Sequence, residues 1–335
     1  MSVAHSVAAV LRQVLLGKTN LPQQCTVAIH DPQTEVSVWL HGIGAPRDVT
    51  FEHSIACAAP FTICLGGGQW PLNRDAGERL VLKFRERDGE KRLLAELGLR
   101  PTGTILTDGP ALRLFQVHGC KNYCLPKGRL WAHYLHQAYL RWRNKGTSHI
   151  RISSRAAHAM IVSFICPRPV VLVSAVSGDR SNIFPMNLLG RVSEGYLAFA
   201  LDSTRLAAPL VAGAGSVALS SIPIEQSEVA RQLGKNHKKE SVPWNQLPFP
   251  TRPSTALSIP VPCFALRVIE LHIETVRNLG SHTFFVARVI RDERRGEGQQ
   301  FSMIHGVYQV WRLTHRHECG GAYGGHSSAE TRQSM

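Results

Sequence analysis

The chain has 335 residues, of which 44% are hydrophobic and 19% are charged. At roughly 100–200 residues per domain, this length predicts two domains, and the ordinary hydrophobic share excludes a wholly disordered protein. No hydrophobic run reaches about 18 residues without a charge, which argues against a membrane-spanning helix. The net charge of +14 indicates either an anionic partner or a generally basic surface.

The start of the chain and its cysteines predict a cytoplasmic protein. From Val3 to Leu16 the hydrophobic residues fall at helical spacing, and the basic start and small-residue cleavage site of a secretion signal are missing. The eight cysteines are scattered along the sequence, which favours reduced thiols over a disulfide framework. The closest pair, Cys120 and Cys124, has no further ligands at a familiar zinc spacing, so no metal site is predicted.

Residues 1–150 predict an α+β domain of unknown role. Alternating or β-branched runs predict strands over 25–30, 36–41 and 80–84. The run EKRLLAELG predicts a helix over 90–98 that ends at a glycine.

A stretch without any acidic residue extends over 110–178. Within it, residues 128–145 predict a helix with one aromatic face and many basic residues on the remaining surface. The residues at that spacing are Trp131, Leu135, Ala138 and Trp142. Such a helix suits a membrane surface or a nucleic acid. We expect the more ordinary arrangement, in which the aromatic face packs on the core and the basic face is solvated.

The second half of the chain is rich in predicted strands with short connections, which fits a closed β-barrel. The predicted strands cover 170–176, 196–201, 216–221, 264–276, 282–291 and 308–313, and a helix is predicted over 224–234. The proline-rich segment 235–262 predicts an ordered excursion or a mobile flap. The tail, residues 315–335, predicts disorder, and its His315, His317 and Cys319 are interpreted as an incidental cluster.

Five pieces of sequence then occur in a characteristic order. They are PRPVVLVSAVSGDRSNIFPMNLLG from residue 167, FALDSTRLAAPLVAGAGSVALSS from 199, IEQSEVARQLGKNHKKES from 224, LGSHTFFVARV from 279 and IHGVYQVWRL from 304. Together, over residues 167–313, they resemble the flavin reductase-like family of FMN-binding split β-barrels. One departure is Ser281, which stands where the family's G-D-H-T stretch usually has Asp. The resemblance implies an α+β fold in which a mostly antiparallel split barrel, residues 151–314, follows the N-terminal α+β domain.

The resemblance also implies where FMN binds. Hydroxyls and a guanidinium after one strand suit its phosphate, and the loop from Asn182 to Leu189 would face the isoalloxazine ring. The implied cofactor-binding residues are Asn182, Pro185, Met186, Asn187, Leu188, Ser203, Thr204, Arg205, Ser220, Ser221 and Tyr308. Ser203 and Thr204 equally suit a helix N-cap, and Tyr308 equally suits the barrel interior.

His282 is the implied catalytic residue, because a donor near the ring stabilises charge on a reduced flavin or orients the hydride donor. The implied activity is hydride transfer from NADH or NADPH to flavin, in a homodimer that passes electrons to oxygen, free flavin or a monooxygenase. Two alternatives remain open. One is an FMN- or haem-binding split barrel without reductase activity. The other is a basic nucleic-acid-binding module, although no helix-turn-helix or zinc-finger spacing supports it.

Overall fold

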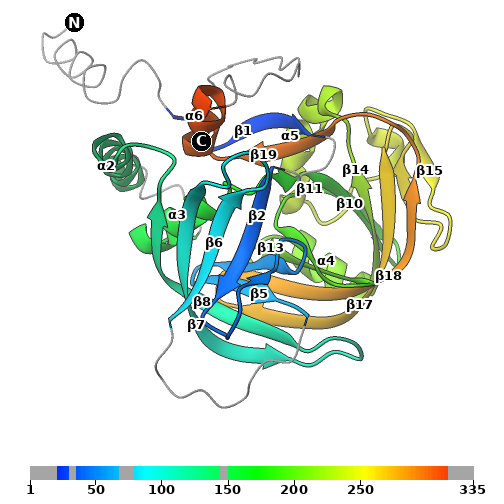
Figure 1. Ribbon diagram of the computed structural model, residues 1–335. Coiled ribbons are helices and arrows are strands. Elements are labelled where there is room, and N and C mark those ends of the chain that lie inside the picture. The colour runs from blue at the N-terminus through cyan, green and yellow to red at the C-terminus, as the bar shows by residue number, and fades with distance from the viewer. Residues whose placement is uncertain (1–20, 30–34, 68–78, 144–149, 316–335) are drawn as a thin grey trace, which may run out of the picture.

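The computed structural model describes residues 21–29, 35–67, 79–143 and 150–315. Its main elements are two seven-stranded antiparallel sheets that lie against one another (Figure 1). No helix among the described residues is long and apolar enough to cross a membrane.

The first sheet belongs to the N-terminal half. Its strands, in chain order, are β2 (Val36–His41), β3 (Arg47–Asp48), β4 (His53–Ala58), β5 (Phe61–Leu65), β6 (Leu80–Glu86), β7 (Leu93–Ile105) and β8 (Leu112–Asn122). Within the sheet they lie in the order β3-β2-β6-β7-β8-β5-β4. The alternating run LVLKF at the start of β6 buries Leu80, Leu82 and Phe84 on one face, as its period of two predicts.

The second sheet belongs to the C-terminal half. Its strands are β10 (Val171–Ser177), β11 (Arg180–Met186), β12 (Leu189–Ser193), β13 (Tyr196–Asp202), β14 (Ser216–Ser221), β17 (Arg267–Leu279) and β18 (His282–Arg294). They lie in the order β11-β10-β14-β17-β18-β13-β12. The stacked rings of Phe199 and Phe285, 4.9 Å apart, lie in the core of this half.

The two sheets share one topology. When the strands of each sheet are numbered from one to seven along the chain, both sheets have the order two-one-five-six-seven-four-three. The N-terminal half, whose sequence resembled no known family, therefore repeats the strand order of the C-terminal half. We call the two units the first barrel and the second barrel.

Helices and short elements cover and connect the barrels. The helices are α2 (Lys127–Arg143), α3 (Ser154–Ser163), α4 (Ala207–Ala214), α5 (Ser227–Leu233) and α6 (Gly306–His315), with the 3-10 turns η1 (Ile224–Gln226), η2 (Gly234–Lys238) and η3 (Trp244–Gln246). The short strands are β1 (Cys25–Ile29), β9 (Arg168–Pro169), β15 (Thr251–Pro253), β16 (Pro260–Pro262) and β19 (Gln300–Ile304).

The first and last elements of the described chain connect the two halves. Strand β1 pairs with β19, which also pairs with β9, so the start of the described chain is joined to its end. Helix α6 packs in the core of the first barrel, and its Arg312 forms a 2.6 Å ion pair with Glu35. This arrangement mixes parts of the two predicted units, and the predicted boundaries near 150 and 314 stay predictions.

Several predicted elements are confirmed and others are wrong. The long strands at 264–276 and 282–291 are confirmed as β17 and β18, and the basic helix is confirmed as α2. Residues 90–98 instead contribute to β7, because they pair with β6 and β8. Residues 308–313 are helical in α6, and the 224–234 helix is divided into η1 and α5. The predicted N-terminal helix and most of the tail lie outside the described residues.

The barrels approach so closely that their contact depends on glycine. A Cβ placed on Gly190 of β12 would lie 2.2 Å from the carbonyl oxygen of His53 in β4, and one on Gly66 would lie 1.5 Å from the carbonyl oxygen of Val192. Both neighbours are backbone atoms, which cannot move aside as a flexible side chain can. Around these glycines, residues of both barrels form one shared hydrophobic cluster that includes Ala56, Ala198 and Phe284.

We expect Gly190→Ala to destabilise the protein, because overpacking of this kind costs about 1–3 kcal/mol or more. Urea unfolding, monitored by fluorescence, measures the free energy of unfolding. Gly119→Ala is the matched control, since Gly119 also lies in a strand and has nothing within 4 Å of an added Cβ. Equal stability of the two variants would contradict the close contact.

Three buried histidines make folding sensitive to acid. Burial, together with the nearby Arg168 guanidinium, lowers the pKa of His53 to about 3. Burial lowers the pKa of His305 to about 3 and that of His133 to about 4, and these two rings lie 5.4 Å apart. All three are therefore neutral in the folded protein, whereas in the unfolded chain they bind protons near pH 6.5.

We expect the free energy of unfolding to fall as the pH drops below about 6.5, by up to about 1.4 kcal/mol per pH unit for each histidine. His305→Asn should make this decline shallower. The side-chain oxygen of the asparagine can replace Nδ1 of His305, which accepts a 3.1 Å hydrogen bond from the Val307 N–H. Urea titrations between pH 4 and pH 8 measure the slope. An unchanged slope in His305→Asn, relative to a control variant of the exposed His272, would contradict the assignment.

Candidate functional site

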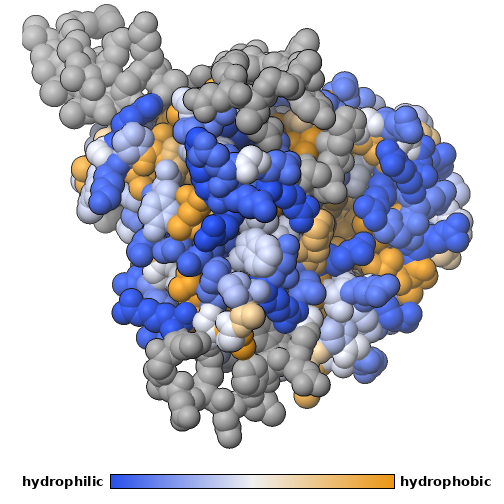
Figure 2. All heavy atoms as spheres, viewed as in Figure 1, coloured by the Kyte–Doolittle hydropathy of each residue, from blue (hydrophilic) through white to orange (hydrophobic). Residues whose placement is uncertain are grey.

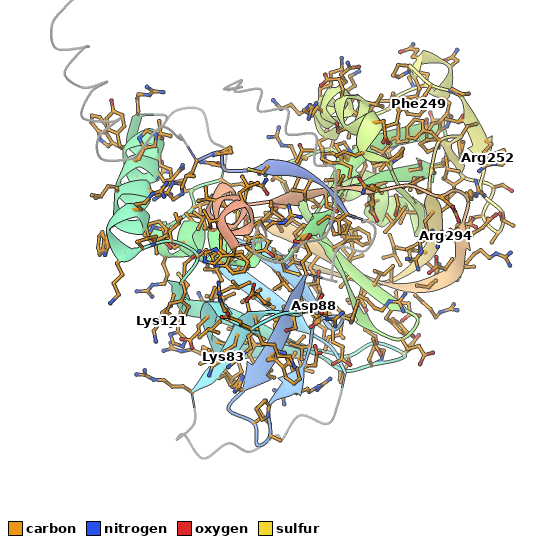
Figure 3. The ribbon with its side chains drawn as sticks, turned by 45° about the horizontal axis from the view of Figure 1, so that its top comes forward. Lys83, Asp88, Lys121, Phe249, Arg252 and Arg294 are labelled. Carbon is orange, nitrogen blue, oxygen red and sulfur yellow. The ribbon has the colours of Figure 1, made fainter. Side chains whose placement is uncertain are left out.

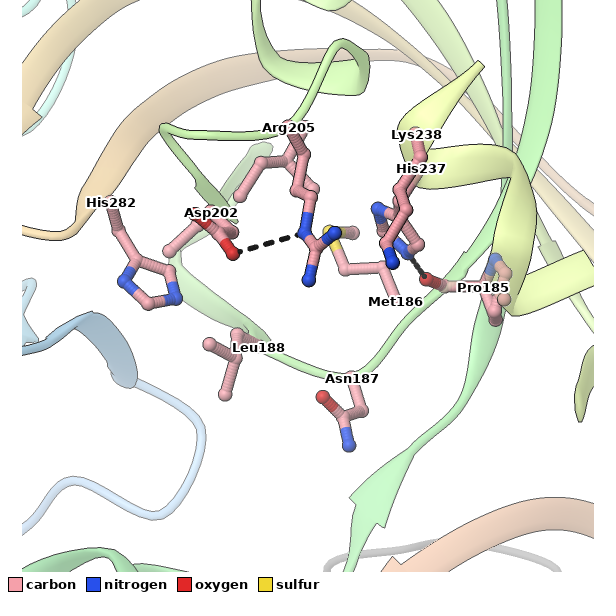
Figure 4. A pocket seen from close by; sticks show the side chains of 12 residues that line it. Pro185, Met186, Asn187, Leu188, Asp202, Arg205, His237, Lys238 and His282 are labelled. Atoms are coloured by element: carbon pink, nitrogen blue, oxygen red, sulfur yellow. Dashed lines mark hydrogen bonds and ion pairs between the residues drawn. The ribbon is translucent and has the colours of Figure 1, made fainter. Parts of the chain in front are cut away.

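A pocket of about 290 Å³ opens at one end of the second barrel (Figure 4). It lies where β11 and β13 end and β18 begins, and the 3-10 turn η2 closes one side. Its lining residues are Pro185, Met186, Asn187, Leu188, Ala200, Leu201, Asp202, Arg205, Gly234, His237, Lys238 and His282.

Asp202 and Arg205 form the polar turn after β13. The Asp202 carboxylate accepts hydrogen bonds from the Thr204 N–H at 2.9 Å and from the Thr204 hydroxyl at 2.7 Å, and it pairs with Arg205 Nε at 3.3 Å. Burial opposes ionisation of Asp202, but the hydrogen bonds from Thr204 and the charge of Arg205 outweigh it and lower the pKa. The turn therefore holds a permanent carboxylate that orients the guanidinium toward the pocket.

The turn η2 brings a second basic group to the pocket. His237 Nε2 lies 2.8 Å from the carbonyl oxygen of Pro185, so it donates to that oxygen. Burial lowers the pKa of His237, which keeps the ring neutral and leaves Lys238 as the cation on this side. In Figure 4, Arg205 and Lys238 approach the pocket from two different elements, above Met186 and Asn187. Among the described residues, Lys238 makes no ion pair.

His282 begins β18 at the opposite end of the pocket, beside Leu188 and Asp202 (Figure 4). Its Nδ1 lies 2.8 Å from the Ser281 hydroxyl and 3.5 Å from the N–H of Ala58 in the first barrel. The Ser281 oxygen itself accepts from the Ala59 N–H at 3.0 Å, so its own proton is available to His282 Nδ1. Two donors at Nδ1 place the histidine proton on Nε2.

The charge state of His282 follows from the same contacts. Burial lowers the pKa of His282, and the Asp202 carboxylate only partly opposes this. The departure at Ser281 strengthens the effect, because a carboxylate at that position would accept from Nδ1–H and favour the imidazolium. A neutral imidazole with Nε2–H is therefore the state near pH 7.

Six of the residues that the sequence proposed line this pocket: Pro185, Met186, Asn187, Leu188, Arg205 and His282. Ser203 and Thr204 lie at its edge, where Ser203 donates to the Ser281 carbonyl at 3.1 Å and Thr204 bonds to Asp202. The structure thus brings the loop after β11, the turn after β13 and the start of β18 together.

The other proposed residues lie elsewhere. Asn182 is buried, and its Nδ2 donates to the carbonyl oxygens of Asn236 at 3.1 Å and Lys239 at 3.0 Å, so it holds η2 in place from behind. Ser220 and Ser221 lie within β14, away from the lining. Tyr308 lies on helix α6 in the core of the first barrel, with its hydroxyl 3.3 Å from Glu35.

Sequence reasoning missed Asp202, His237 and Lys238. Asp202 lies directly before two residues that it did select. His237 and Lys238 belong to the KNHKK run, which was assigned to an excursion rather than to the site. The basic run itself was the available signal, because a cluster of cations suits an anionic ligand.

A second, larger depression of about 680 Å³ lies on the first barrel. The turn between β4 and β5, strands β7 and β8 and the start of α3 form its walls; the lining residues are Ala59, Pro60, Phe61, Arg100, Gln116, Val117, His118, Arg151, Ser153, Arg155 and Ala156. Among the described residues, its three arginines make no ion pair. Ala59, which lines this depression, donates to the hydroxyl of Ser281, and Ser281 directly precedes His282 of the pocket.

No curated protein matches the chain. An FMN-binding protein from Thermus thermophilus is similar to it, with 22% identity over 38% of this chain and 73% of that one, at a TM-score of 0.35. An NADH:FAD oxidoreductase from Streptomyces globisporus has 16% identity over 48% of this chain and 95% of that one, at a TM-score of 0.41.

A styrene monooxygenase flavin reductase from Pseudomonas putida has 17% identity over 44% of this chain and 91% of that one, at a TM-score of 0.37. The resemblance inferred from sequence over 167–313 is confirmed: the model of the flavin reductase like domain matches residues 163–312.

Proposed function

We propose that the pocket of the second barrel binds FMN and that the protein is an oxidoreductase of the flavin reductase type, using NADH or NADPH. The observation that carries the proposal is the meeting of two cations, an apolar wall and a neutral histidine in one pocket, inside the segment that matches the family model. Bound FMN would supply the ring that accepts a hydride and passes electrons on.

The residues of the pocket fit the parts of FMN. Arg205 and Lys238 provide charge and N–H donors for a phosphate. Met186, Leu188 and Leu201 provide an apolar surface for a flat ring. His282 offers a neutral Nε2–H donor, which stabilises negative charge that develops beside it without carrying a full charge of its own. Its position is fixed by the first barrel through Ala58 and Ser281.

The basic depression on the first barrel suits the nicotinamide substrate. NADH and NADPH carry a pyrophosphate, and Arg100, Arg151 and Arg155 supply the matching charge. The start of α3, whose N-cap is Ser153, adds the favourable end of a helix dipole. Ala59 lines this depression and donates to Ser281, the residue next to His282, so a dinucleotide held there would extend toward His282 through its nicotinamide end.

The acceptor and the assembly are proposed from the resemblance alone. We propose that electrons leave to oxygen, to free flavin or to a monooxygenase, and that the protein is a homodimer. A second chain would have to use a face other than β12, because the first barrel already covers that strand.

The first test is the visible absorption spectrum of the purified protein with added FMN, followed by anaerobic NADH or NADPH. We expect a bound-flavin spectrum that bleaches with one of the two nucleotides. Failure to bind any flavin would overturn the cofactor assignment. Flavin that binds without bleaching would overturn the reductase activity.

A double variant separates phosphate binding from ring binding. We expect Arg205→Gln with Lys238→Gln to weaken FMN about tenfold or more, because hydrogen bonds to charged groups contribute about 1.5–3 kcal/mol. Riboflavin, which lacks the phosphate, should bind the variant and the wild type equally. Fluorescence titration measures both affinities. Arg231→Gln, outside the pocket and paired with Glu228, is the control. Equal losses for both ligands would contradict the phosphate role.

Arg155→Gln tests the dinucleotide site. We expect the KM for NADH or NADPH to rise by about tenfold, since one charge-assisted contact is lost, while FMN affinity and kcat stay unchanged. Steady-state oxidation of the nucleotide measures both constants. Arg252→Gln, an exposed arginine on the far side of the second barrel (Figure 3), is the control. An unchanged KM would contradict binding of the nucleotide in the depression.

A further inference from the structure

Helix α2 presents its hydrophobic face to solvent. The exposed fraction is 67% for Trp131, 63% for Leu135, 62% for Trp142 and 47% for Tyr139. These are four of the twelve large hydrophobic side chains that are exposed among the described residues. The expectation that this face packs on the core is therefore wrong, and only Leu130, His133 and Gln137 of the helix are buried.

The inward face mixes hydrophobic and polar residues, because Leu130 and the half-buried Tyr134 pack in the core of the first barrel beside His133 and Gln137. Gln137 Oε1 accepts from Gln23 Nε2 at 2.6 Å, and the His133 ring lies against the His305 ring. The helix thus keeps a second hydrophobic stripe in solvent, whereas an ordinary surface helix turns its apolar stripe to the core. Exposure of two tryptophans, a leucine and a tyrosine on one stripe costs free energy in water, and such a stripe marks a surface that is covered in use.

Cations flank the stripe on both sides. At about 100° per residue, Trp131, Trp142 and Leu135 fall within about 40° of one another. Lys127 lies about 40° beyond Trp131 on one side, and Arg143 lies about 40° beyond Tyr139 on the other. Both cations are exposed. The helix contains no acidic residue, and neither does the whole stretch 110–178. Hydrophobic and hydrophilic side chains are correspondingly interspersed where α2 reaches the surface (Figure 2).

From this arrangement we propose that α2 binds the surface of an anionic lipid membrane, lying in its plane with Trp131, Leu135 and Trp142 in the interface. A lipid surface is the occupant that satisfies both features at once. Tryptophan and tyrosine rings sit at the level of the headgroups, and cations beside an apolar stripe meet anionic headgroups. A protein partner would need an apolar groove with acidic rims on both sides, whereas an anionic bilayer provides that chemistry over its whole area.

The location of the helix permits such binding without blocking the pocket of the second barrel. Helix α2 stands at one side of the molecule, opposite the labelled Arg252 and Arg294 (Figure 3). Its exposed face lines neither the pocket nor the basic depression. Binding would therefore hold the protein at a membrane while both hollows stay open.

The test is flotation of the full-length protein with phosphatidylcholine vesicles that contain or lack phosphatidylglycerol. We expect binding to the anionic vesicles, a blue shift of tryptophan fluorescence, and release by high salt. Trp131→Ser with Trp142→Ser should reduce the partition coefficient about tenfold or more. Lys127→Gln with Arg143→Gln should do the same, because both cations beside the stripe attract the anionic surface. All four side chains are exposed, so the melting temperature and flavin affinity should not change.

Arg252→Gln with Arg294→Gln is the charge-matched control and should float like the wild type. Four outcomes would overturn the proposal: no flotation, equal flotation on neutral vesicles, equal loss in the control, or a blue shift that follows protein concentration or added single-stranded DNA instead of vesicles. The third would show that net charge acts rather than α2. The last would assign the face to a second copy or to a nucleic acid.

Discussion

The structure depends on a contact in which two backbones meet with no side chain between them. Gly190 of β12 lies against the His53 carbonyl, and Gly66 lies against the Val192 carbonyl. Only glycine permits this separation, and it brings the third strand of one barrel against the third strand of the other. The Ser54 hydroxyl then reaches the Ala198 carbonyl at 3.1 Å, and a hydrophobic cluster drawn from both barrels excludes water around the contact. The two halves consequently behave as parts of one packed unit.

The chemistry of the pocket follows from that contact. Because β4 lies against the second barrel, the turn after it reaches Ser281, and the Ala58 and Ala59 N–H groups determine the hydrogen bonds of His282. The tautomer of a histidine in one half is thus set by the backbone of the other half. The same turn forms a wall of the basic depression. The N-terminal half is accordingly a structural part of the site, a role that its own sequence did not reveal.

The sequence predicted the second barrel well where the chemistry is local. Strands β17 and β18 alternate strongly, and the turn that carries Arg205 follows a strand that its hydrophobic run predicts. The predicted loop 182–189 is wrong over 182–186, which pair with β10 and belong to β11, ending at Met186. Prediction from the sequence failed where strand pairing decides the structure. Leu94 and Leu97 fit either a helix or a strand, and only the pairing with β6 and β8 selects the strand. Residues 308–313 have the same ambiguity, which packing against the first barrel resolves as a helix. The shared strand order could not be predicted from the sequence, because the two halves repeat the connections between strands but not the residue patterns. Lys238 was missed because η2 reaches the pocket through Asn182, a tertiary contact.

The identical strand orders allow the two barrels to be compared position by position, and they are not equivalent in charge. The fourth strand of the second barrel, β13, ends at Asp202 and leads to Arg205, whereas its counterpart β5 leads into Gly66 and Gly67. The seventh strand of the second barrel starts with His282, and its counterpart β8 starts with the buried Leu112. Among the described residues at the matching positions of the first barrel, the guanidinium and the imidazole have no counterparts. Two barrels of one strand order thus differ in the groups that the proposed flavin site requires, and that proposal implies one flavin per chain rather than two.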